Sequence, residues 1–264
     1  KGLVGNPFKK AHAALLFVCS IGHAKKTIKK FNPDIVVGFG GYPSASAVQA
    51  AFGLKIKTMI HEQNSIIGLT NKILIKKVDQ IVCCYQKAYQ EFPKEKTLLL
   101  GNPRASVIVH EQPKDVYDEY HLDRQKKVVT IVMGSLGSQT VNQTMKECMD
   151  QFKGKDYQVV YVSGKPYYES MKAYENENVH IVPYVNDMPS LMHITDLIVS
   201  RAGASTLAEL TALGVPAILI PSPYVSANHQ EYNARELVNN QAADMILEKD
   251  LTGEKLISTI DAII

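Results

Sequence analysis

The sequence predicts an α/β protein of two doubly wound lobes, each built on a parallel sheet with helices on both faces. Strand-like and helix-like segments alternate along the whole chain, and most of the strand-like segments are continuous apolar runs. A charged stretch without strands separates two such series, and 264 residues are enough for two lobes of ordinary size. Parallel strands bring their carboxyl ends to one edge of a sheet, so a ligand cleft is expected there.

The first series spans residues 1–107 and is expected to form a truncated lobe. It opens in a helix-like segment, so we expect that one or more βα units precede it. Apolar runs bounded by turn residues predict its strands at 34–38, 57–61, 80–84 and 98–100. Helical patterns follow at 45–52, 69–77 and 86–92.

The second series begins after a polar connection, residues 108–127, and the second lobe is residues 128–264. Its strands are predicted at 128–133, 158–162, 180–182, 197–200, 217–220 and 244–247, with helical sequence between them. The four cysteines have neither disulfide nor zinc spacing. The adjacent pair Cys83 and Cys84 is expected to be buried thiols of a reducing cytosol.

Charge is divided unevenly between the two lobes. Residues 1–107 carry 16 Lys and Arg against 5 Asp and Glu, whereas residues 108–264 carry 13 against 21. Lys9, Lys10 and a later group of lysines flank the apolar stretch 11–21, which is too short to cross a bilayer. Such a segment can rest on an anionic membrane, or it can be a core helix with a solvated end. No nucleic-acid-reading motif is recognisable, so the membrane is favoured over nucleic acid.

The most informative motif lies in the second lobe. A strand ends at Arg201, and a helix is predicted to start near Ser205 and to stop at Gly214. The first N–H groups of that helix would lie at the edge of the sheet, where they suit a phosphate or a sugar diol. In a second interpretation, Thr206 and Glu209 form only a capping box, in which the carboxylate reaches back to the helix start.

Four other loops place polar residues at the same edges, at 40–44, 61–72, 101–104 and 134–139. The last of them fits no dinucleotide fingerprint, P-loop or hydrolase elbow, so it is either a general diphosphate or sugar loop or a plain tight turn. His61 and the polar residues after it suit a hydroxyl-rich ligand, and His61 could take up a proton near neutral pH. No metal-ligand spacing is present, so helix ends and Arg104 or Arg201 are expected to neutralise a diphosphate.

Together these motifs resemble the MurG family, glycosyltransferases that add N-acetylglucosamine to lipid I in peptidoglycan synthesis. They occur in the family's order and cover nearly the whole chain. The matching motifs are Gly40-Gly-Tyr-Pro-Ser44, His61-Glu-Gln-Asn64 with Gly68-Leu-Thr-Asn71, Gly101-Asn-Pro-Arg104, Gly134-Ser-Leu-Gly137, Ser200-Arg-Ala-Gly203 with Glu209, Gly214-Val-Pro216 and His229-Gln-x-x-Asn233.

The resemblance implies a GT-B fold with a cleft between the lobes and UDP-N-acetylglucosamine as the donor. The residues that it places against the donor are Asn64, Ser135, Val185, the helix start Ala204, Ser205, Thr206, Leu207 and Ala208, and then Glu209 and Gln230. Glu209 would bind the ribose hydroxyls, and the backbone of Val185 would lie against uracil. Tyr42, His61 and Asn71 would face the acceptor, a lipid-linked MurNAc-pentapeptide.

The implied reaction is inverting: the C4 hydroxyl of the acceptor's MurNAc attacks the anomeric carbon of the donor, and UDP leaves. It needs no cofactor or metal, and it implies a peripheral enzyme resting on the anionic cytoplasmic face of the bacterial plasma membrane. The family's first Gly-rich loop, which carries its usual base, has no counterpart here, so His61 is the candidate base. We therefore expect the 264-residue polypeptide to be inactive alone, although its second lobe should bind the UDP-sugar.

Three other functions stay open. A UDP-N-acetylglucosamine 2-epimerase would share the fold and the nucleotide, but it needs several carboxylates at the cleft, where the first-lobe loops offer only Glu62. Another GT-B transferase that uses UDP-sugars would have similar motifs. A non-catalytic partner protein that binds a UDP-sugar is the third alternative.

Overall fold

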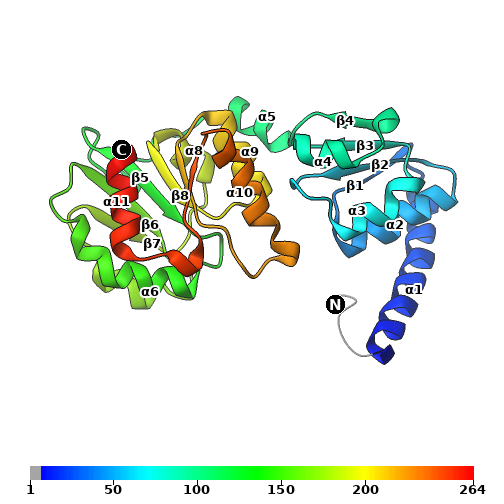
Figure 1. The fold of residues 1–264 in the computed structure, drawn as a ribbon, viewed down its shortest axis with the longest axis horizontal. Coiled ribbons are helices and arrows are strands. Elements are labelled where there is room, and N and C mark those ends of the chain that lie inside the picture. The colour runs from blue at the N-terminus through cyan, green and yellow to red at the C-terminus, as the bar shows by residue number, and fades with distance from the viewer. Residues whose placement is uncertain (1–6) are drawn as a thin grey trace. The chain divides into compact units, whose positions relative to one another are not determined.

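The computed structural model describes residues 7–264, with the side chains of residues 7–11, 13 and 14 outside the description (Figure 1). The membrane role predicted for the side chains of Lys9 and Lys10 therefore lies outside the described residues. Contacts divide the chain into two compact units, Lys1–Gly101 and Asn102–Ile264.

The boundary between the units falls earlier than residue 107, the expected end of the first lobe. The reason is the helix α5 (Pro103–His110), which packs along the helix α9 (Ala204–Leu213) of the second unit. Ile108 of α5 is fully buried there. Burial of this apolar side chain ties the segment that follows Gly101 to unit 2.

Unit 1 contains a four-stranded parallel sheet in the order β1-β2-β3-β4. Its strands are β1 (Ile35–Gly38), β2 (Lys57–Glu62), β3 (Gln80–Cys83) and β4 (Thr97–Leu99). Its helices are α1 (Pro7–Phe31), α2 (Gly41–Gly53), α3 (Leu69–Leu74) and α4 (Gln86–Glu91), with 3-10 turns at Ile75–Lys77 and Lys94–Lys96. The four predicted strands are confirmed, each to within one residue at either end.

The connection after β1 is tighter than the sequence predicts. The predicted loop is 40–44, but α2 already begins at Gly41, because Gly40 takes a φ of 84° that turns the chain sharply. Pro43 lies in the first turn of α2, where its missing N–H group is not needed. A Cβ atom on Gly38 would lie only 2.5 Å from the Ser44 hydroxyl, so strand and helix are in close contact here.

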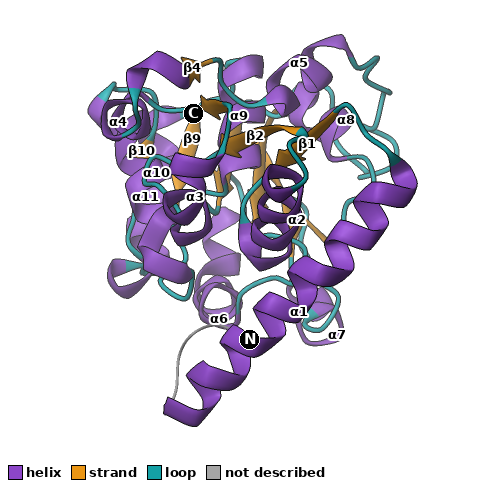
Figure 2. Cartoon of the chain, turned by 90° about the vertical axis from the view of Figure 1, so that its right-hand side faces the viewer, coloured by secondary structure: helices purple, strands orange, loops and turns teal. Residues whose placement is uncertain are grey.

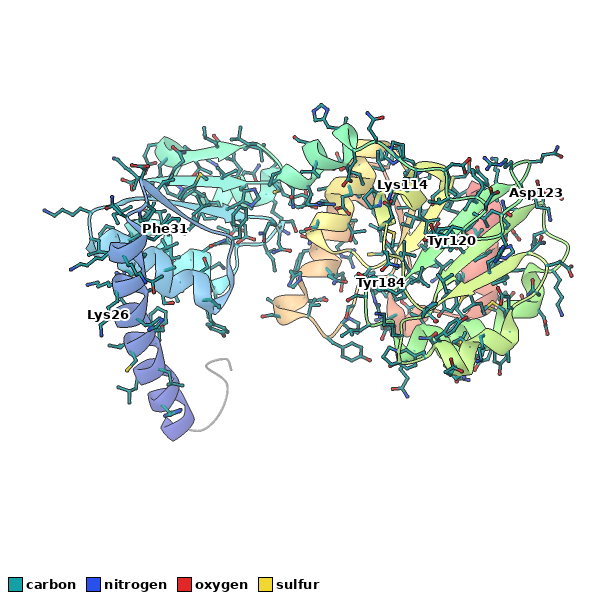
Figure 3. All side chains as sticks on the ribbon, turned by 180° about the vertical axis from the view of Figure 1, so that it is seen from behind. Lys26, Phe31, Lys114, Tyr120, Asp123 and Tyr184 are labelled. Atoms are coloured by element: carbon teal, nitrogen blue, oxygen red, sulfur yellow. The ribbon has the colours of Figure 1, made fainter. Side chains whose placement is uncertain are left out.

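Helix α1 packs on the rest of unit 1 through its second half, where it runs beside α2 (Figure 2). In its first half Leu15 and Val18 are 62% and 63% exposed, so these two side chains are not part of a core. Lys26 and Lys29 follow these two residues by about three helical turns and therefore lie on the same face. Lys26 lies on the exposed surface of the helix (Figure 3). None of the described helices is both long and apolar enough to span a membrane.

Unit 2 contains a six-stranded parallel sheet in the order β10-β9-β8-β5-β6-β7. Its strands are β5 (Lys127–Val132), β6 (Tyr157–Val162), β7 (Val179–Val182), β8 (Leu197–Ser200), β9 (Ala217–Leu219) and β10 (Asp244–Met245). Besides α5 and α9, its helices are α6 (Gln139–Cys148), α7 (Tyr168–Met171), α8 (Met188–Ile194), α10 (His229–Asn239) and α11 (Gly253–Ile263). The six predicted strands are confirmed, although β10 ends two residues early.

The strand order of unit 2 reverses beside β5, the first strand of the unit. The chain moves outward from β5 through β6 and β7 and then returns to β8 on the other side of β5. Figure 1 shows α6 and α11 on one face of the sheet and α8, α9 and α10 on the other. Such a doubly wound sheet opens a crevice at the carboxyl ends of the strands where the order reverses.

The loop after β5 is held against the loop after β6 by two glycines. Gly137 has a φ of 72°, and a Cβ atom there would lie 2.2 Å from the Ser163 carbonyl oxygen. Gly164 has a φ of 88°, and its Cβ atom would lie 2.6 Å from the Leu136 carbonyl oxygen. Because each obstacle is backbone, neither loop can relax without moving the other, and the path of residues 134–138 is fixed.

We predict that Gly137→Ala destabilises unit 2 more than Gly134→Ala does. Gly134 has a similar φ of 82°, but a Cβ atom there would meet no other atom within 4 Å, so it controls for backbone strain alone. Left-handed strain should lower the free energy of unfolding by about 1 kcal/mol in both variants. Overpacking should add about 1–3 kcal/mol in Gly137→Ala. Urea denaturation measures the difference, and equal losses would contradict the tight contact between the loops.

Candidate functional site

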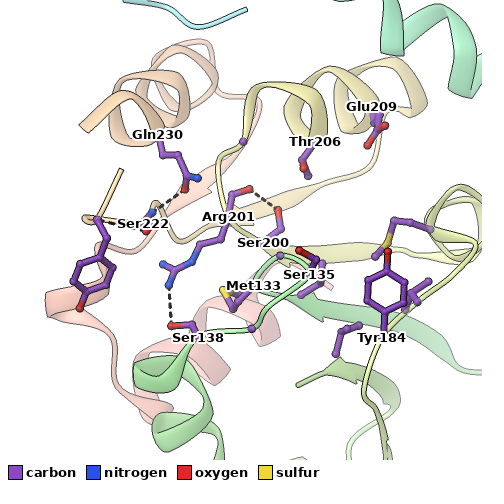
Figure 4. Close-up of a pocket in the computed structure, with 18 of the residues that line it drawn as sticks. Met133, Ser135, Ser138, Tyr184, Ser200, Arg201, Thr206, Glu209, Ser222 and Gln230 are labelled. Atoms are coloured by element: carbon purple, nitrogen blue, oxygen red, sulfur yellow. Dashed lines mark hydrogen bonds between the residues drawn. The ribbon is translucent and has the colours of Figure 1, made fainter. Parts of the chain in front are cut away.

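Unit 2 contains a cavity of about 650 Å³ at the carboxyl ends of β5, β6 and β8, which is the crevice expected from the strand order. Figure 4 shows it between α9, α10 and the loop after β5. Six of the residues predicted from the sequence line it: Ser135, Val185, Arg201, Thr206, Glu209 and Gln230. The fold thus brings together side chains from five separate loops and helix starts.

The start of α9 carries no side-chain cap. Its N-cap is Gly203, and the first helical bond runs from the Leu207 N–H to the Gly203 carbonyl oxygen at 2.9 Å. The N–H groups of Ala204, Ser205 and Thr206 therefore have no partner within the helix. Because Gly203 and Thr206 line the cavity, the positive end of the helix dipole faces it, which suits a phosphate group.

Two residues of the predicted phosphate-binding run, Leu207 and Ala208, lie beyond the free amides of α9. The Leu207 N–H already donates within the helix, and the Leu207 side chain is 1% exposed and faces the core. Ala208 lies one residue further along the helix, beyond the turn whose amides are free. Free amides are a property of a helix's first turn, so they are those of Ala204, Ser205 and Thr206, and a role of Leu207 and Ala208 at the donor stays a prediction.

Glu209 does not reach back to the helix start. Its Oε1 atom accepts from two nitrogens of Arg104, Nε at 2.6 Å and Nη2 at 2.6 Å. The capping-box interpretation is therefore wrong, since α9 begins at Ala204 and Thr206 is its third residue. The Oε2 atom of Glu209 accepts no hydrogen bond from the described residues, and the side chain lines the cavity. One carboxylate oxygen is thus available to a ligand.

Arg201 is already neutralised by another carboxylate. Its guanidinium donates to Glu248, to the Ser138 hydroxyl at 2.8 Å and to the Ile220 carbonyl oxygen at 3.0 Å. The side chains of Arg201 and Glu248 are only 11% and 5% exposed. Ser138 is the N-cap of α6 and accepts from the Val141 N–H. Arg201 was expected from the sequence to balance a diphosphate. In the structure its hydrogen bonds join the loop after β5 to the end of β9.

The far end of the cavity is apolar and aromatic. Val185 lines this end and is 4% exposed. Tyr184 stands beside it with 40% exposure, and the Lys165 ammonium lies 5.1 Å from its ring centroid. Met188 and Met192 of α8 complete this end. The aromatic and the two methionines were not predicted from the sequence, although Tyr184 directly precedes the predicted Val185.

The opposite end of the cavity is formed by the start of α10 and the loop before it. The Gln230 Oε1 atom accepts from the Ser222 N–H at 2.8 Å, so the side-chain amide group Nε2 is turned toward the cavity as a donor (Figure 4). Tyr224 lines the same end and is 80% exposed. Ala227 and Asn228 take positive φ values of 54° and 52°, a conformation that L residues rarely adopt. Ser222 and Tyr224 were missed because no motif singles them out.

The polar motif of unit 1 is organised by a buried carboxylate. Glu62, at the end of β2, is 2% exposed. Its Oε1 atom accepts from the Asn64 N–H and the Asn64 side-chain amide, and its Oε2 atom accepts from the Gly68 N–H at 2.9 Å and from the Asn71 side-chain amide at 2.8 Å. The four bonds tie the loop after β2 to the start of α3. Asn71 is itself 2% exposed and also donates to the His61 carbonyl oxygen.

The predicted acceptor residues of unit 1 differ in accessibility. Tyr42 is 50% exposed at the start of α2, whereas His61 is 4% exposed. The His61 Nε2 atom lies 3.0 Å from the Gly101 carbonyl oxygen and must carry the proton, so Nδ1 holds the lone pair. Nδ1 is buried and has no hydrogen-bond partner among the described residues. Asn71, buried against Glu62, is placed as a support of the loop and not on its outer surface.

The two cysteines at the end of β3 are held in the protonated form by their surroundings. Burial raises the pKa of the Cys83 thiol to about 11 and that of Cys84 to about 12, so both remain protonated near neutral pH. The expected burial is confirmed for Cys83, whereas Cys84 is only half-buried because it follows the end of β3. Between residues 7 and 264 the structure gathers no group of three or more His, Cys, Asp or Glu side chains that could hold a metal ion.

Breaking the Arg201–Glu248 pair should destabilise unit 2. Glu248→Ala leaves a guanidinium in the interior without its carboxylate, which typically lowers the free energy of unfolding by about 3 kcal/mol or more. Asp150→Ala, which removes the partner of the exposed Lys153, is the matched control and should change little. Urea denaturation checks both, and a Glu248→Ala loss no larger than the control's would show that the pair is not structural.

Comparisons with known proteins agree with this geometry. The model of the glycosyltransferase family 28 C-terminal domain matches residues 128–264, and that of the family 28 N-terminal domain matches residues 3–83. A UDP-N-acetylglucosamine–N-acetylmuramyl-(pentapeptide) pyrophosphoryl-undecaprenol N-acetylglucosamine transferase of Bacillus cytotoxicus is 44% identical over 262 residues, which cover 97% of this chain and 72% of the relative. A Bacillus cereus transferase of the same name is 46% identical over 253 residues, 94% of this chain and 70% of the relative.

Solved structures extend the likeness to the fold. MurG of Acinetobacter baumannii superposes with a TM-score of 0.75 at 28% identity, over 94% of this chain and 70% of that one. The UDP-GlcNAc 2-epimerase of Methanocaldococcus jannaschii has a TM-score of 0.65 over 98% of this chain and 76% of its own, but at 14% identity it shares the fold alone. The α/β GT-B prediction is confirmed, and the chain belongs to glycosyltransferase family 28 and, within it, to the MurG family.

Proposed function

We propose that this chain transfers N-acetylglucosamine from UDP-N-acetylglucosamine to the C4 hydroxyl of the MurNAc of undecaprenyl-pyrophosphoryl-MurNAc-pentapeptide, which converts lipid I to lipid II in peptidoglycan synthesis. The observation that carries the proposal is the cavity of unit 2. It is bordered by the uncapped start of α9, by the Glu209 carboxylate with one oxygen left over, and by an apolar aromatic end. These groups suit a phosphate, a sugar diol and a base, respectively.

The donor is assigned to this cavity part by part. The amides of Ala204, Ser205 and Thr206 hold the diphosphate, and the Ser135 loop approaches it from β5. Glu209 receives the ribose hydroxyls on its free oxygen, and the backbone of Val185 lies against uracil. The Gln230 side-chain amide donates to a hydroxyl of the sugar. Each subsite of the donor thus meets a group of matching chemistry.

Departure of UDP is the step that these groups promote. As the bond from the anomeric carbon to the β-phosphate oxygen breaks, negative charge grows on the diphosphate. Oriented amides at a helix start stabilise that charge without reorganising, so they act more strongly on the transition state than on the bound donor. The proposal needs no metal ion, because the helix end supplies the positive potential.

The acceptor is assigned to unit 1. Tyr42 is exposed and is proposed to contact the lipid-linked sugar, and Asn64 to approach the donor. His61 is the candidate base, through Nδ1, the nitrogen that holds the lone pair. That atom is buried, so the acceptor hydroxyl must gain access to it for His61 to act as a base. Asn71 is proposed to act through this loop rather than on the acceptor directly.

The same loop argues against an epimerase. An epimerase moves a proton at a sugar carbon and needs carboxylates that can exchange protons with the substrate. Glu62, the one carboxylate of the first-lobe loops, is 2% exposed and accepts four hydrogen bonds from the loop itself. It is therefore committed to structure. A non-catalytic binding partner is not favoured by any feature of the cavity.

The first half of α1 is proposed as the contact with the membrane. Leu15 and Val18 are exposed, and Lys26 and Lys29 extend the same face, while Leu16 is exposed on another side of the helix. Apolar side chains can enter the headgroup region while lysines attract anionic lipids. The protein is accordingly proposed to be peripheral, on the cytoplasmic face of the bacterial plasma membrane, with the anionic inner leaflet as its partner and no nucleic acid.

Donor selection tests the proposed function. Calorimetric titration should give tighter binding of UDP-N-acetylglucosamine than of UDP-N-acetylgalactosamine, UDP-glucose or ADP-glucose. Glu209→Ala should weaken binding of UDP-N-acetylglucosamine about tenfold or more, since a hydrogen bond to a charged group is lost. Glu254→Ala, on the exposed side of α11, is the control and should leave affinity unchanged.

Two results would contradict this assignment. One is equal affinity for the uridine and adenosine nucleotides, and the other is unchanged affinity in a folded Glu209→Ala protein. The epimerase alternative has its own readout: the appearance of UDP-N-acetylmannosamine when the chain is incubated with UDP-N-acetylglucosamine. Transfer of labelled N-acetylglucosamine to lipid I, followed in vesicles, reports the reaction itself.

Membrane contact is tested by cosedimentation with vesicles that contain phosphatidylglycerol. The double variant Leu15→Ser with Val18→Ser should bind several-fold more weakly, because two apolar side chains no longer enter the headgroup region. Binding of the wild type should also fall as salt is raised. Val109→Ser removes a similarly exposed valine from α5 and is the matched control. Equal binding by the double variant and this control would rule out the α1 face.

A further inference from the structure

We propose that Arg104 is the positioning residue of the ribose site: it holds the Glu209 carboxylate so that one oxygen faces the cavity, and it does not touch the diphosphate. This inference rests on the proposed function and deepens it, because it explains how the carboxylate that is proposed to bind the ribose is oriented. It reassigns Arg104, which was expected from the sequence to neutralise a diphosphate.

The contact between the two side chains is one-sided. Both Nε and Nη2 of Arg104 lie 2.6 Å from the same atom, Oε1 of Glu209. A guanidinium that is merely balancing a carboxylate commonly bonds both of its oxygens, one to each nitrogen. Here Oε1 is occupied twice, and Oε2 is left for a hydrogen-bond donor from the cavity. The glutamate side chain is 12% exposed, so its orientation is set by this partner and not by water.

Arg104 is itself held firmly by the helix that carries it. Its backbone N–H donates to the Asn102 side chain, the N-cap of α5, at 3.0 Å. Pro103 fixes the first turn of this helix. Further along, Ile108 buries α5 against α9. The guanidinium therefore reaches Glu209 from a neighbouring helix of the same unit, across 105 residues of sequence.

Distance along α9 separates Arg104 from the phosphate subsite. Glu209 lies five residues after Ala204, which is roughly 7.5 Å along the helix axis at the usual rise per residue. Two of the Arg104 guanidinium nitrogens already contact Glu209 at this position along the helix. Arg104 is thus placed at the pentose, while the free amides are placed at the diphosphate.

The Arg104–Glu209 pair also reduces the repulsion between the Glu209 carboxylate and a diphosphate in the same cavity. A carboxylate that shares a cavity with a diphosphate would repel it, and the low exposure of Glu209 limits screening by water. The Arg104 charge offsets that repulsion while leaving Oε2 as an acceptor. Removal of Arg104 should therefore affect ribose recognition first, through both the orientation and the charge of Glu209.

The experiment compares the affinities of UDP and dUDP, which differ only in the 2′-hydroxyl. Wild type is expected to favour UDP about tenfold or more, as a hydrogen bond to a charged group predicts. In Arg104→Gln that preference should fall to within about threefold, as it should in Glu209→Ala. The double variant should show no further loss of the preference, because the two residues act as one unit. Arg104→Lys keeps the positive charge but lacks the two parallel N–H donors of a guanidinium. Compared with Arg104→Gln, it should therefore recover only part of the preference for UDP.

Controls separate this role from a structural one and from the proposed function. Arg124→Gln removes an exposed guanidinium from another Arg–carboxylate pair of unit 2 and should keep the full UDP preference. A purely structural Arg104 would weaken UDP and dUDP equally, and a phosphate-binding Arg104 would lower the affinity of UDP relative to uridine with the 2′-hydroxyl preference intact. Either result overturns the inference. If wild type does not prefer UDP over dUDP, the ribose role of Glu209 fails instead.

Discussion

An uncapped helix start at the edge of a parallel sheet is the constraint on which the rest of unit 2 depends. Gly203 cannot offer a side-chain cap, so the first amides of α9 remain without a partner within the helix. Buried or half-buried amides need a partner, and a phosphate supplies one more strongly than water does. The crevice, the loop with Gly134 and Gly137 and the Glu209 carboxylate form the space that these amides face.

Some polar motif residues of this protein bond to other segments of the chain and fix their positions, and others present groups to the cavity. Arg201 clasps three segments with its partner Glu248, and Glu62 gathers four N–H groups in unit 1. Both are nearly out of water. A charge in such a place is stable only when it is paired or hydrogen-bonded, so these bonds fix the segments that the two side chains join. What faces the ligand is largely backbone, together with the free oxygen of Glu209.

This division explains how a site can be rigid before it is occupied. The loop after β5 is pressed against the loop after β6, and its far end is clasped by Arg201. The loop before α10 is different, since Ala227 and Asn228 take left-handed conformations and Tyr224 is exposed. A preorganised phosphate subsite stabilises a leaving group efficiently, because no rearrangement accompanies the growth of charge.

The sequence alone determined the α/β class, the ten strands and the motifs that resemble one family, because these depend on local periodicity and turn residues. It also placed Ser135, Arg201 and Glu209 at sheet edges. Tertiary structure alone decided the ion-pair partners of Arg201 and Glu209, since Glu248 and Arg104 are distant along the chain. A capping box and an ion pair with a distant arginine leave the same local pattern around Glu209. Only the packing of α5 on α9 distinguishes them, because it brings a guanidinium within hydrogen-bonding distance of the carboxylate.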